Sequence, residues 1–394
     1  MMSQDNAELK NLIAKLKKII KQLLSVLSEF YNFDFKEIIK NFPPDDFSKI
    51  SLNAFKISDV KINNPIIAAP MAGISDNAYR IFAKYLGCSL TFSEMVTSYG
   101  LILNHEKSLD ITKLTDFERP CAIQIFGSDP DIIANAASII EGNADIIDIN
   151  MGCPVPKVLK TKSGGYLLNE PETIGSIVKK LKEKIKKPVT VKLRVGWDEG
   201  KINILEIAKI VENEGADAIT IHGRTVKQGY SGKADYEHIK KVKSNVKIPV
   251  IASGDIESVH KAKWVLDYTG CDGLMVGRAA RGNPWIFSDL LLGLLSTSEN
   301  REAGFKNQSG ESLNNPDINF IKNYFNISNN LKVDFMLLYI RFLIYFKGEE
   351  RAVKEFRKII GWVFKGQRDI SSIRNKFFKI NTFADAEEIL ESLR

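Results

Sequence analysis

Cys153 follows an apolar run in the stretch 145–157, which reads DIIDINMGCPVPK. The run Ile146–Ile149 has the pattern of a buried strand, and Gly152 and Pro154 favour a turn directly after it. A thiol with an ordinary pKa of ~8.5 is mostly protonated at pH 7, so it can serve as a general acid. The alternative is a small apolar side chain that fills a gap in the core.

Further candidate residues lie towards the ends of the apolar runs or directly after them. They are Pro70, Met71, Ala72, Gln124, Asn150, Lys192, Arg194, His222, Arg224, Ser253, Gly254, Asp255, Gly277 and Arg278. Glycine lets backbone N–H groups approach an anion and arginine neutralises it, so the last two runs favour a phosphate site. Singly, each residue has a structural interpretation, such as a tight turn, a core ion pair or a buried histidine. Together they predict an active site for a phosphate-bearing cofactor.

The elements that would position these residues are visible as eight short apolar runs. They occupy 65–71, 89–95, 120–127, 144–152, 188–196, 216–224, 248–255 and 271–279. Segments with helical periodicity separate them, and strand alternating with helix eight times favours a parallel (β/α)8 TIM barrel of the α/β class. A doubly wound sheet is the alternative, but no G-x-G-x-x-G follows the first run. In a barrel, all the strand-end residues lie on one rim.

Segments outside the eight runs differ in composition. FKISDVKIN, from Phe55, predicts a hairpin that closes the bottom of the barrel. The expected domains are an amphipathic N-terminal helical extension (1–50), the catalytic barrel (51–295), a polar linker (296–317) and a small helical bundle (318–394). The N-terminal helix is expected to pack on its own protein or pair with a second copy, or else to contact RNA or a membrane surface. The oligomeric state stays open.

Cysteine spacing, hydropathy and charge limit the class of protein. The four cysteines form no CxxC pair and no Cys/His ligand spacing, so we expect neither a disulfide framework nor a metal site. No apolar stretch reaches the roughly 18–20 residues of a membrane span, and a signal-peptide pattern is missing. We therefore expect a cytoplasmic protein. A formal net charge of +7 suits a nucleic-acid partner without requiring one.

Several motifs together point to a known family. APMAGISDNAYR, SEM, DINMGCPVPKV, VKLRVGW, ITIHGRT, SGD and VGRAARGNPWIF occur in this order. Over residues 55–290 their order and spacing resemble the tRNA-dihydrouridine synthases, in particular the bacterial-type branch, with a weaker match through the C-terminal helices. The resemblance implies reduction of the uridine C5=C6 bond in tRNA, with FMN as cofactor and NADPH or NADH as electron donor. A hydride would pass from flavin N5 to C6, and a proton from Cys153 to C5.

The resemblance also implies roles for the matching residues. Pro70, Met71 and Ala72 would line the flavin, and Gln124, Lys192 and His222 would bond its ring edge. Gly254, Asp255, Gly277 and Arg278 would hold the phosphate of FMN, with Ser253 beside them. For the substrate, Asn150 would contact the base edge, Arg224 would lie near the rim, and a basic face with Arg357 and Lys358 would bind tRNA.

Three departures from the family pattern separate this chain from a typical member. Ser253 replaces the usual Asn, Ile359 and Val363 replace the usual His and Tyr, and residues 1–50 have no counterpart. Two alternatives therefore remain. One is an FMN-dependent dehydrogenase of a free pyrimidine, which would not need a basic helical domain, and the other is a tRNA-binding protein whose flavin site has decayed.

Overall fold

The computed structural model describes residues 51–302, 329–364 and 370–394. The chain divides into two compact units, one spanning residues 50–280 and another that contains the described residues from Arg281 onward. The predicted N-terminal helix lies outside the described residues, as does most of the predicted linker. Helix α12 (Ile286–Glu302) continues past position 296, where we expected that linker to begin.

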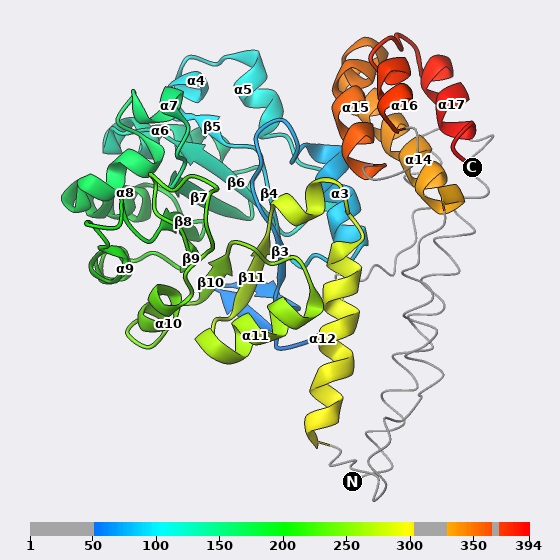
Figure 1. Ribbon diagram of the computed structural model, residues 1–394. Helices are drawn as coiled ribbons and strands as arrows, with labels where there is room; N and C mark the ends of the chain where they lie inside the picture. Colours follow the sequence, from blue (N-terminus) through cyan, green and yellow to red (C-terminus); the bar gives the residue numbers. More distant parts are fainter. Residues whose placement is uncertain (1–50, 303–328, 365–369) are drawn as a thin grey trace, which may run out of the picture. The chain divides into compact units, whose positions relative to one another are not determined.

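The unit of residues 50–280 is a parallel barrel (Figure 1). Its strands are β3 (Ile66–Ala68), β4 (Thr91–Phe92), β5 (Val96–Thr97), β6 (Cys121–Phe126), β7 (Ile146–Met151), β8 (Val189–Arg194), β9 (Ala218–His222), β10 (Val250–Ser253) and β11 (Gly273–Val276). The hydrogen-bonded order is β3-β11-β10-β9-β8-β7-β6-β4, and β5 extends the pairing with β6. A parallel bridge between Ile67 and Leu90 closes the ring. Each of the eight predicted runs contains one barrel strand, so the predicted fold is confirmed.

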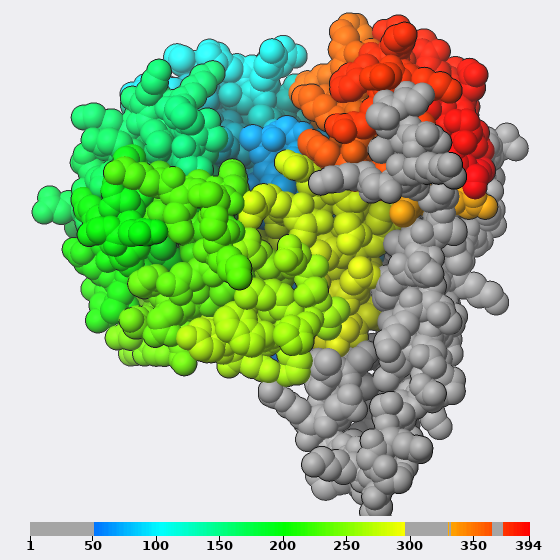
Figure 2. Space-filling model, in the orientation of Figure 1, coloured from blue at the N-terminus to red at the C-terminus, as the bar shows by residue number. Residues whose placement is uncertain are grey.

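Helices surround the strands on the outside. They are α3 (Asn77–Tyr85), α4 (Ser98–Ile102), α5 (Glu106–Ile111), α6 (Pro130–Ile140), α7 (Pro156–Leu159), α8 (Pro171–Lys184), α9 (Ile204–Asn213), α10 (Glu237–Lys243) and α11 (Val259–Thr269). In Figure 1 the helices α8 to α11 lie around the outside of the strands, and in the space-filling view of Figure 2 the strands are hidden from this side. Proline begins α6 and α8, where its missing N–H costs no helical hydrogen bond. The strands are consequently buried on both faces and rich in Val and Ile.

A hairpin closes the amino-terminal end of the barrel, as we expected. Strands β1 (Phe55–Ile57) and β2 (Val60–Ile62) are antiparallel, and Ser58 in their turn has a φ of 54°. Ile57 and Ile62 are fully buried and join a core cluster with Ile146 and other residues near the starts of the strands. This end of the barrel is therefore sealed, which leaves the carboxyl ends of the strands for chemistry.

Aspartates directly before three strands repeat one arrangement. Asp145 accepts a hydrogen bond from Cys121 N (2.8 Å), Asp217 from Val189 N (2.7 Å) and Asp272 from Val250 N (2.8 Å). Each carboxylate also pairs with a cation, at 2.7 Å with Arg119, 2.7 Å with Lys182 and 2.6 Å with Lys243. The carboxylates thus satisfy the first N–H of the neighbouring strand, where the ladder offers no other acceptor. They fix the strand starts on which the opposite rim depends.

The described residues after Arg281 are mostly helical, and those from Asn329 onward form helices as predicted. The helices are α12, α14 (Asn329–Lys347), α15 (Glu349–Val363), α16 (Ile370–Phe377) and α17 (Phe383–Glu391). Gly348, with a φ of +74°, separates α14 from α15. Phe356 and Phe377 are buried and meet edge to face, with ring centroids 6.5 Å apart. Aromatic packing of this kind stabilises the contact between α15 and α16.

Candidate active site

The strand register places the predicted residues side by side at one end of the barrel. Gln124 on β6 pairs with Asp148 on β7, and Asn150, two residues later on β7, pairs with Lys192 on β8. On the far side of β8, His222 on β9 lies between Arg194 and Ser253 in the register. Because alternate residues of a strand face the same side, these side chains share the barrel interior at its carboxyl end. The structure thus brings together residues that are up to 129 positions apart, from Gln124 to Ser253.

Cys153 differs from the other three cysteines in its exposure. It is half-buried, whereas Cys88, Cys121 and Cys271 are buried. Burial raises the pKa of the Cys153 thiol above its ordinary value, against the opposing effect of the nearby cations Lys192 and Arg194. The thiol therefore keeps its proton at neutral pH while remaining accessible. This combination suits a proton donor and does not suit a thiolate nucleophile.

A chain of hydrogen bonds runs from the interior of the barrel to the turn that carries Cys153. The backbone N–H of Cys153 donates to Asn150 Oδ1 at 2.9 Å, and Asn150 Nδ2 donates to Gln124 Oε1 at 2.9 Å. Gln124 Nε2 in turn donates to Asp148 Oδ2 at 2.7 Å, and Thr190 Oγ1 donates to Asp148 Oδ1 at 2.6 Å. Burial raises the pKa of Asp148 to about 7, although both hydrogen bonds oppose this. Two predicted site residues are thus linked to one another and to the cysteine.

Lys192 and His222 form a basic part of the site. Among the described residues, no side chain or carbonyl accepts a hydrogen bond from Lys192 Nζ. Burial, with repulsion from Arg194, lowers the pKa of Lys192 to about 8. Burial and the surrounding cations, Lys192 first among them, also lower the pKa of His222, which is therefore neutral at pH 7. An ammonium group without an acceptor, beside a neutral imidazole, is suited to an electron-rich or anionic ligand.

Arg194 joins the Cys153 turn to the loop after β9. It is 2% exposed, and its Nε donates to Gly152 O at 2.9 Å. Its NH1 donates to Thr225 O and to Gly229 O, each at 2.7 Å. Since its Nε and NH1 groups donate to backbone carbonyls on both sides, Arg194 holds two rim loops together.

Asp255, which follows β10, binds the cations that follow β9 and β11. Its Oδ2 accepts from Arg224 NH2 at 2.8 Å, and its Oδ1 accepts from Arg278 NH2 at 2.9 Å. Burial alone would raise the pKa of Asp255, but the hydrogen bond from Ala234 N and the two arginines outweigh burial and lower it. Arg224 is 2% exposed, whereas the side chain of Arg278 is 44% exposed. Arg278 is therefore the arginine of this pair that is open to an anion.

The two glycines predicted to hold the cofactor differ in what surrounds them. Gly254 has a φ of +114°, and a Cβ there would lie 2.8 Å from both Ala234 Cβ and His222 Cδ2. A Cβ on Gly277 would approach only Ala69 Cβ, at 3.4 Å. After β3, Pro70 and Met71 are half-buried and Ala72 is exposed. The backbone beside Gly277 is thus open, whereas the backbone beside Gly254 packs against the protein itself.

A sequence profile of the family described as "Dihydrouridine synthase (Dus)" matches residues 66–394. The chain belongs to the dihydrouridine synthase family. Similar proteins include "tRNA-dihydrouridine synthase B" of Pasteurella multocida (strain Pm70), 39% identical over 86% of this chain and 94% of that protein. The proteins of the same name from Vibrio vulnificus (strain CMCP6) and Salmonella typhimurium (strain LT2) are 37% and 38% identical, over 85% and 86% of this chain and 97% of each relative.

The solved structure of a 2-naphthoyl-CoA reductase complex is similar at 14% identity, with a TM-score of 0.49 over 63% of this chain and 52% of that one. This likeness is too slight to support any argument about the dihydrouridine synthase.

The helical unit of this dihydrouridine synthase neutralises part of its predicted basic face. Arg351 pairs with Glu355 at 3.0 Å and Lys354 with Glu350 at 2.6 Å. Arg357 donates to Ile380 O and Asn381 Oδ1, so it ties α15 to the segment before α17. Lys358 is exposed and has no acidic partner among the described residues. Lys358 is therefore the better candidate of the two predicted RNA-binding residues of this helix.

The structure adds Asp148 to the site and gives the predicted Arg194 its partners. Asp148 had no predicted role, although its spacing of two from Asn150 on a strand puts both side chains on one face. Arg194 was noted as a strand-end cation but given no partner, because the carbonyls that it binds belong to two separate loops. From the sequence, only the two-residue spacing of Asp148 and Asn150 could have indicated one of these contacts.

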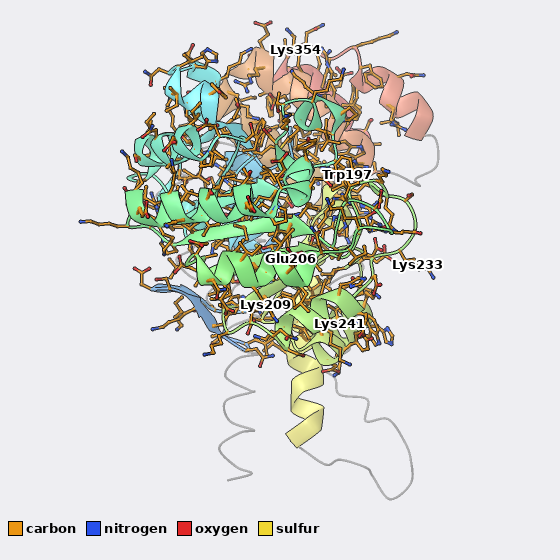
Figure 3. All side chains as sticks on the ribbon, turned by 90° about the vertical axis from the view of Figure 1, so that its left-hand side faces the viewer. Trp197, Glu206, Lys209, Lys233, Lys241 and Lys354 are labelled. Atoms are coloured by element: carbon orange, nitrogen blue, oxygen red, sulfur yellow. The ribbon has the colours of Figure 1, made fainter. Side chains whose placement is uncertain are left out.

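Outside the rim, the described residues were compared with three other kinds of site: a surface pocket, a metal centre and a membrane-spanning helix. A surface pocket of about 310 Å³ is lined by residues of α9 and α10, including Glu206 and Lys241, which Figure 3 labels, and by none of the predicted site residues. In the described ranges, no cluster of three or more His, Cys, Asp or Glu side chains could hold a metal ion. Nor does any described helix have the length and apolar character to cross a membrane.

Proposed function

We propose that this dihydrouridine synthase reduces the C5=C6 bond of particular uridines in tRNA, using FMN as cofactor and NADPH or NADH as electron donor. The observation that carries the proposal is a half-buried Cys153, whose thiol pKa is raised by burial, on the same barrel rim as Lys192, whose ammonium has no hydrogen-bond acceptor among the described residues. Relatives that match most of the chain are named as enzymes of this activity. Because tRNA is the proposed substrate, we expect the protein to act in the cytoplasm.

The donor set of the rim fits a flavin mononucleotide. FMN has an electron-rich pyrimidine edge and a phosphate, and the site offers the free ammonium of Lys192 for the first and the exposed Arg278 for the second. Gly277, beside which the backbone is open, would allow a phosphate to approach closely, Gly254 would lie next to it, and neutral His222 and Gln124 offer further hydrogen bonds. Pro70, Met71, Ala72, Ser253 and Asp255 would complete the contacts. When bound, FMN supplies the hydride that uracil C6 receives.

Cys153 provides the proton that balances this hydride. Its S–H bond breaks as a C–H bond forms at uracil C5, and the thiolate that remains is reprotonated from solvent. Lys192 and Arg194 favour the thiolate electrostatically, so they lower the cost of this step without deprotonating the thiol beforehand. General acids of this kind typically contribute ~10²–10⁴-fold to the rate.

Asn150 is the proposed contact for the base edge. Its Oδ1 already accepts from the N–H groups of Gly152 and Cys153, and one Nδ2–H donates to Gln124. The other Nδ2–H faces Met95 Sδ at 3.7 Å, and a thioether is a weak acceptor. A uracil carbonyl would be a stronger acceptor for that N–H, so substrate binding would exchange a weak bond for a good one.

For the rest of the tRNA, we propose contacts to both units. The barrel would act as the catalytic domain and the helical unit as a tRNA-binding domain, with Lys358 free to meet a phosphate. Arg357 would contribute mainly by holding the segment at Ile380 and Asn381 in place. Arg224 lies near the rim, but its observed partners are Asp255 and loop carbonyls, so it would support RNA binding by fixing the loop.

One purified preparation tests the proposal against its alternatives. The protein should show a flavin absorption band and, with NADPH, should convert uridine in unmodified tRNA to a nucleoside heavier by two hydrogens, detected by mass spectrometry. Free uracil should be reduced far more slowly. Comparable turnover of free uracil would favour the free-pyrimidine dehydrogenase, and colourless protein that still binds tRNA would favour a decayed flavin site.

A further inference from the structure

Asp148 lies at the base of the hydrogen-bond chain that ends at Cys153. It is completely buried, Gln124 is 1% exposed and Asn150 is 8% exposed. In its ionised form, which predominates above its raised pKa of about 7, Asp148 only accepts hydrogen bonds, so Asp148 Oδ2 then requires the NH₂ group of Gln124 to face it. The Gln124 carbonyl oxygen must then face Asn150, whose own NH₂ group points to Gln124. Each amide therefore has one orientation that satisfies its neighbours.

The last amide oxygen in this chain determines where the Cys153 turn can lie. Asn150 Oδ1 accepts from Gly152 N at 3.2 Å and from Cys153 N at 2.9 Å. If both amides turned over, the Asn150 NH₂ group would face those two N–H donors, and four donors would lack acceptors. A buried polar group left unpaired in this way costs ~1–3 kcal/mol.

We propose that Asp148 is a positioning residue: as the acceptor at the base of the chain, it sets the direction of the Gln124 and Asn150 amides and thereby holds the thiol of Cys153 in place for proton transfer. The effect of Asp148 on proton transfer rests on the proposed function, whereas its positioning of the Cys153 turn does not. Asp148 itself is separated from the Cys153 backbone by two intervening side chains. Its influence on the reaction is therefore indirect.

Three substitutions separate this role from a general contribution to folding. Asp148→Leu removes the acceptor. Asp148→Asn keeps an oxygen that can accept from Gln124, while its NH₂ group can donate to the Thr190 hydroxyl. Thr190→Val breaks the other hydrogen bond of the same carboxylate, from Thr190 Oγ1 at 2.6 Å, and leaves the chain to Cys153 intact. It is the matched control for a lost buried hydrogen bond.

The thiol itself supplies a readout that does not depend on uridine reduction. Cys153 is half-buried and the other three cysteines are buried, so iodoacetamide should alkylate Cys153 first, and peptide mass spectrometry gives the rate. In flavin-loaded Asp148→Leu, we expect this rate to rise by at least about threefold, because the turn is released and opens more often. Thr190→Val should match the wild type. Thermal unfolding and flavin absorbance verify that each variant is folded and loaded.

Single-turnover reduction of uridine in tRNA gives the second readout. Asp148→Leu should lower the rate by about 100-fold, as expected when a catalytic group is misplaced by an ångström, and Asp148→Asn by about tenfold or less. The proposal is overturned if Asp148→Asn is as slow as Asp148→Leu, because charge would then matter more than the acceptor. It is also overturned if Asp148→Leu behaves like Thr190→Val in both readouts.

The positioning role of Asp148 can still be tested if Asp148→Leu does not fold or if the wild type shows no activity. If Asp148→Leu does not fold, Asp148→Ala replaces it, with the same expected results, because a water in the space both donates and accepts and so dictates no amide direction. If wild-type protein reduces no uridine, the proposed function fails, while the alkylation rates still decide whether Asp148 positions Cys153.

Discussion

At the scale of the residue, the proposed reaction requires a thiol that is open to a substrate and still protonated. Burial raises the pKa of Cys153, and the cations Lys192 and Arg194 limit that rise. The buried Cys88 and Cys271 have pKa values raised to about 12 and about 11, so they remain thiols but lie within the core. Position on the rim, more than acidity, distinguishes the proposed proton donor.

Replacing Cys153 with alanine tests the proton-donor role. Cys153→Ala should keep the flavin band and its bleaching by NADPH, but uridine reduction in tRNA should fall by ~10²-fold or more, because the general acid is lost. Cys271→Ala, at a buried cysteine before β11, is the control and should retain reduction. Stopped-flow absorbance follows flavin reduction, and nucleoside mass spectrometry follows the product. Unchanged tRNA turnover in Cys153→Ala would contradict the role.

His222 gives a prediction for stability as a function of pH. Its pKa is lowered in the folded protein, so below about pH 6.5 the unfolded chain takes up a proton that the folded protein does not. Stability is therefore lost as pH falls from 6.5, by up to ~1.4 kcal/mol per pH unit. His222→Gln should lack this loss, so its free energy of unfolding relative to wild type should rise between pH 7 and pH 5. Guanidinium denaturation of the apoproteins measures the difference, and a constant difference would contradict the prediction.

At the scale of the element, the rim is held by contacts at both ends of the strands. The aspartates before β7, β9 and β11 bind the first N–H of a neighbouring strand and a cation. At the carboxyl ends, Arg194 ties the Cys153 turn to the loop after β9, and Asp255 joins the arginines that follow β9 and β11. Catalytic geometry in this barrel consequently depends on residues that touch no substrate.

Loss of one such aspartate should destabilise the barrel. Asp217→Ala leaves Val189 N and the Lys182 ammonium without their shared acceptor, so we expect a loss of ~1–3 kcal/mol in the free energy of unfolding. The control is Asp110→Asn, which breaks an exposed ion pair with Lys113 and should cost less than ~0.5 kcal/mol. Urea denaturation compares them. If both variants lost the same free energy of unfolding, the contact of Asp217 with Val189 N would contribute no more to stability than an exposed ion pair.

The eight strands could be predicted because each is a short apolar run that ends in Gly, Pro or polar residues, as in Ile146–Met151 followed by Gly152. The same runs placed Gln124, Lys192 and His222 on one rim. Hydrogen-bond partners could not be predicted, since they depend on which side chains from different strands meet. Arg224 shows the difference: it lies at the rim as expected, yet its guanidinium is buried against Asp255. Asp148 was missed because a buried carboxylate in an apolar run resembles part of the strand pattern.

At the scale of the whole molecule, a tRNA-modifying enzyme needs binding surface beyond its pocket. The described part of the helical unit offers fewer free cations on α15 than its sequence suggests, because Glu350 and Glu355 pair with Lys354 and Arg351. Each phosphate contact releases counterions from tRNA. The logarithm of the affinity should therefore fall with the logarithm of the salt concentration, with a slope proportional to the number of such contacts. The paired and unpaired lysines of α15 can therefore be distinguished by experiment.

Lys358→Ala should weaken tRNA binding and reduce the slope of log affinity against log salt by about 1, the loss of one phosphate contact. Lys354→Ala, on the same helix but already paired with Glu350, should change that slope much less. Filter binding or fluorescence anisotropy over a range of salt concentrations measures both. Identical slopes for Lys358→Ala and the wild type would remove Lys358 from the proposed tRNA surface.

In the proposed function, this chain makes dihydrouridine in tRNA by means of Cys153. The most direct measurement is mass-spectrometric mapping of dihydrouridine in tRNA from cells that lack the protein and are complemented with the wild type, with Cys153→Ala or with an empty vector. We predict that at least one tRNA position regains dihydrouridine with the wild type and stays uridine in the other two. Identical maps from wild-type and empty-vector cells would contradict the activity, and full restoration by Cys153→Ala would contradict the assigned proton donor.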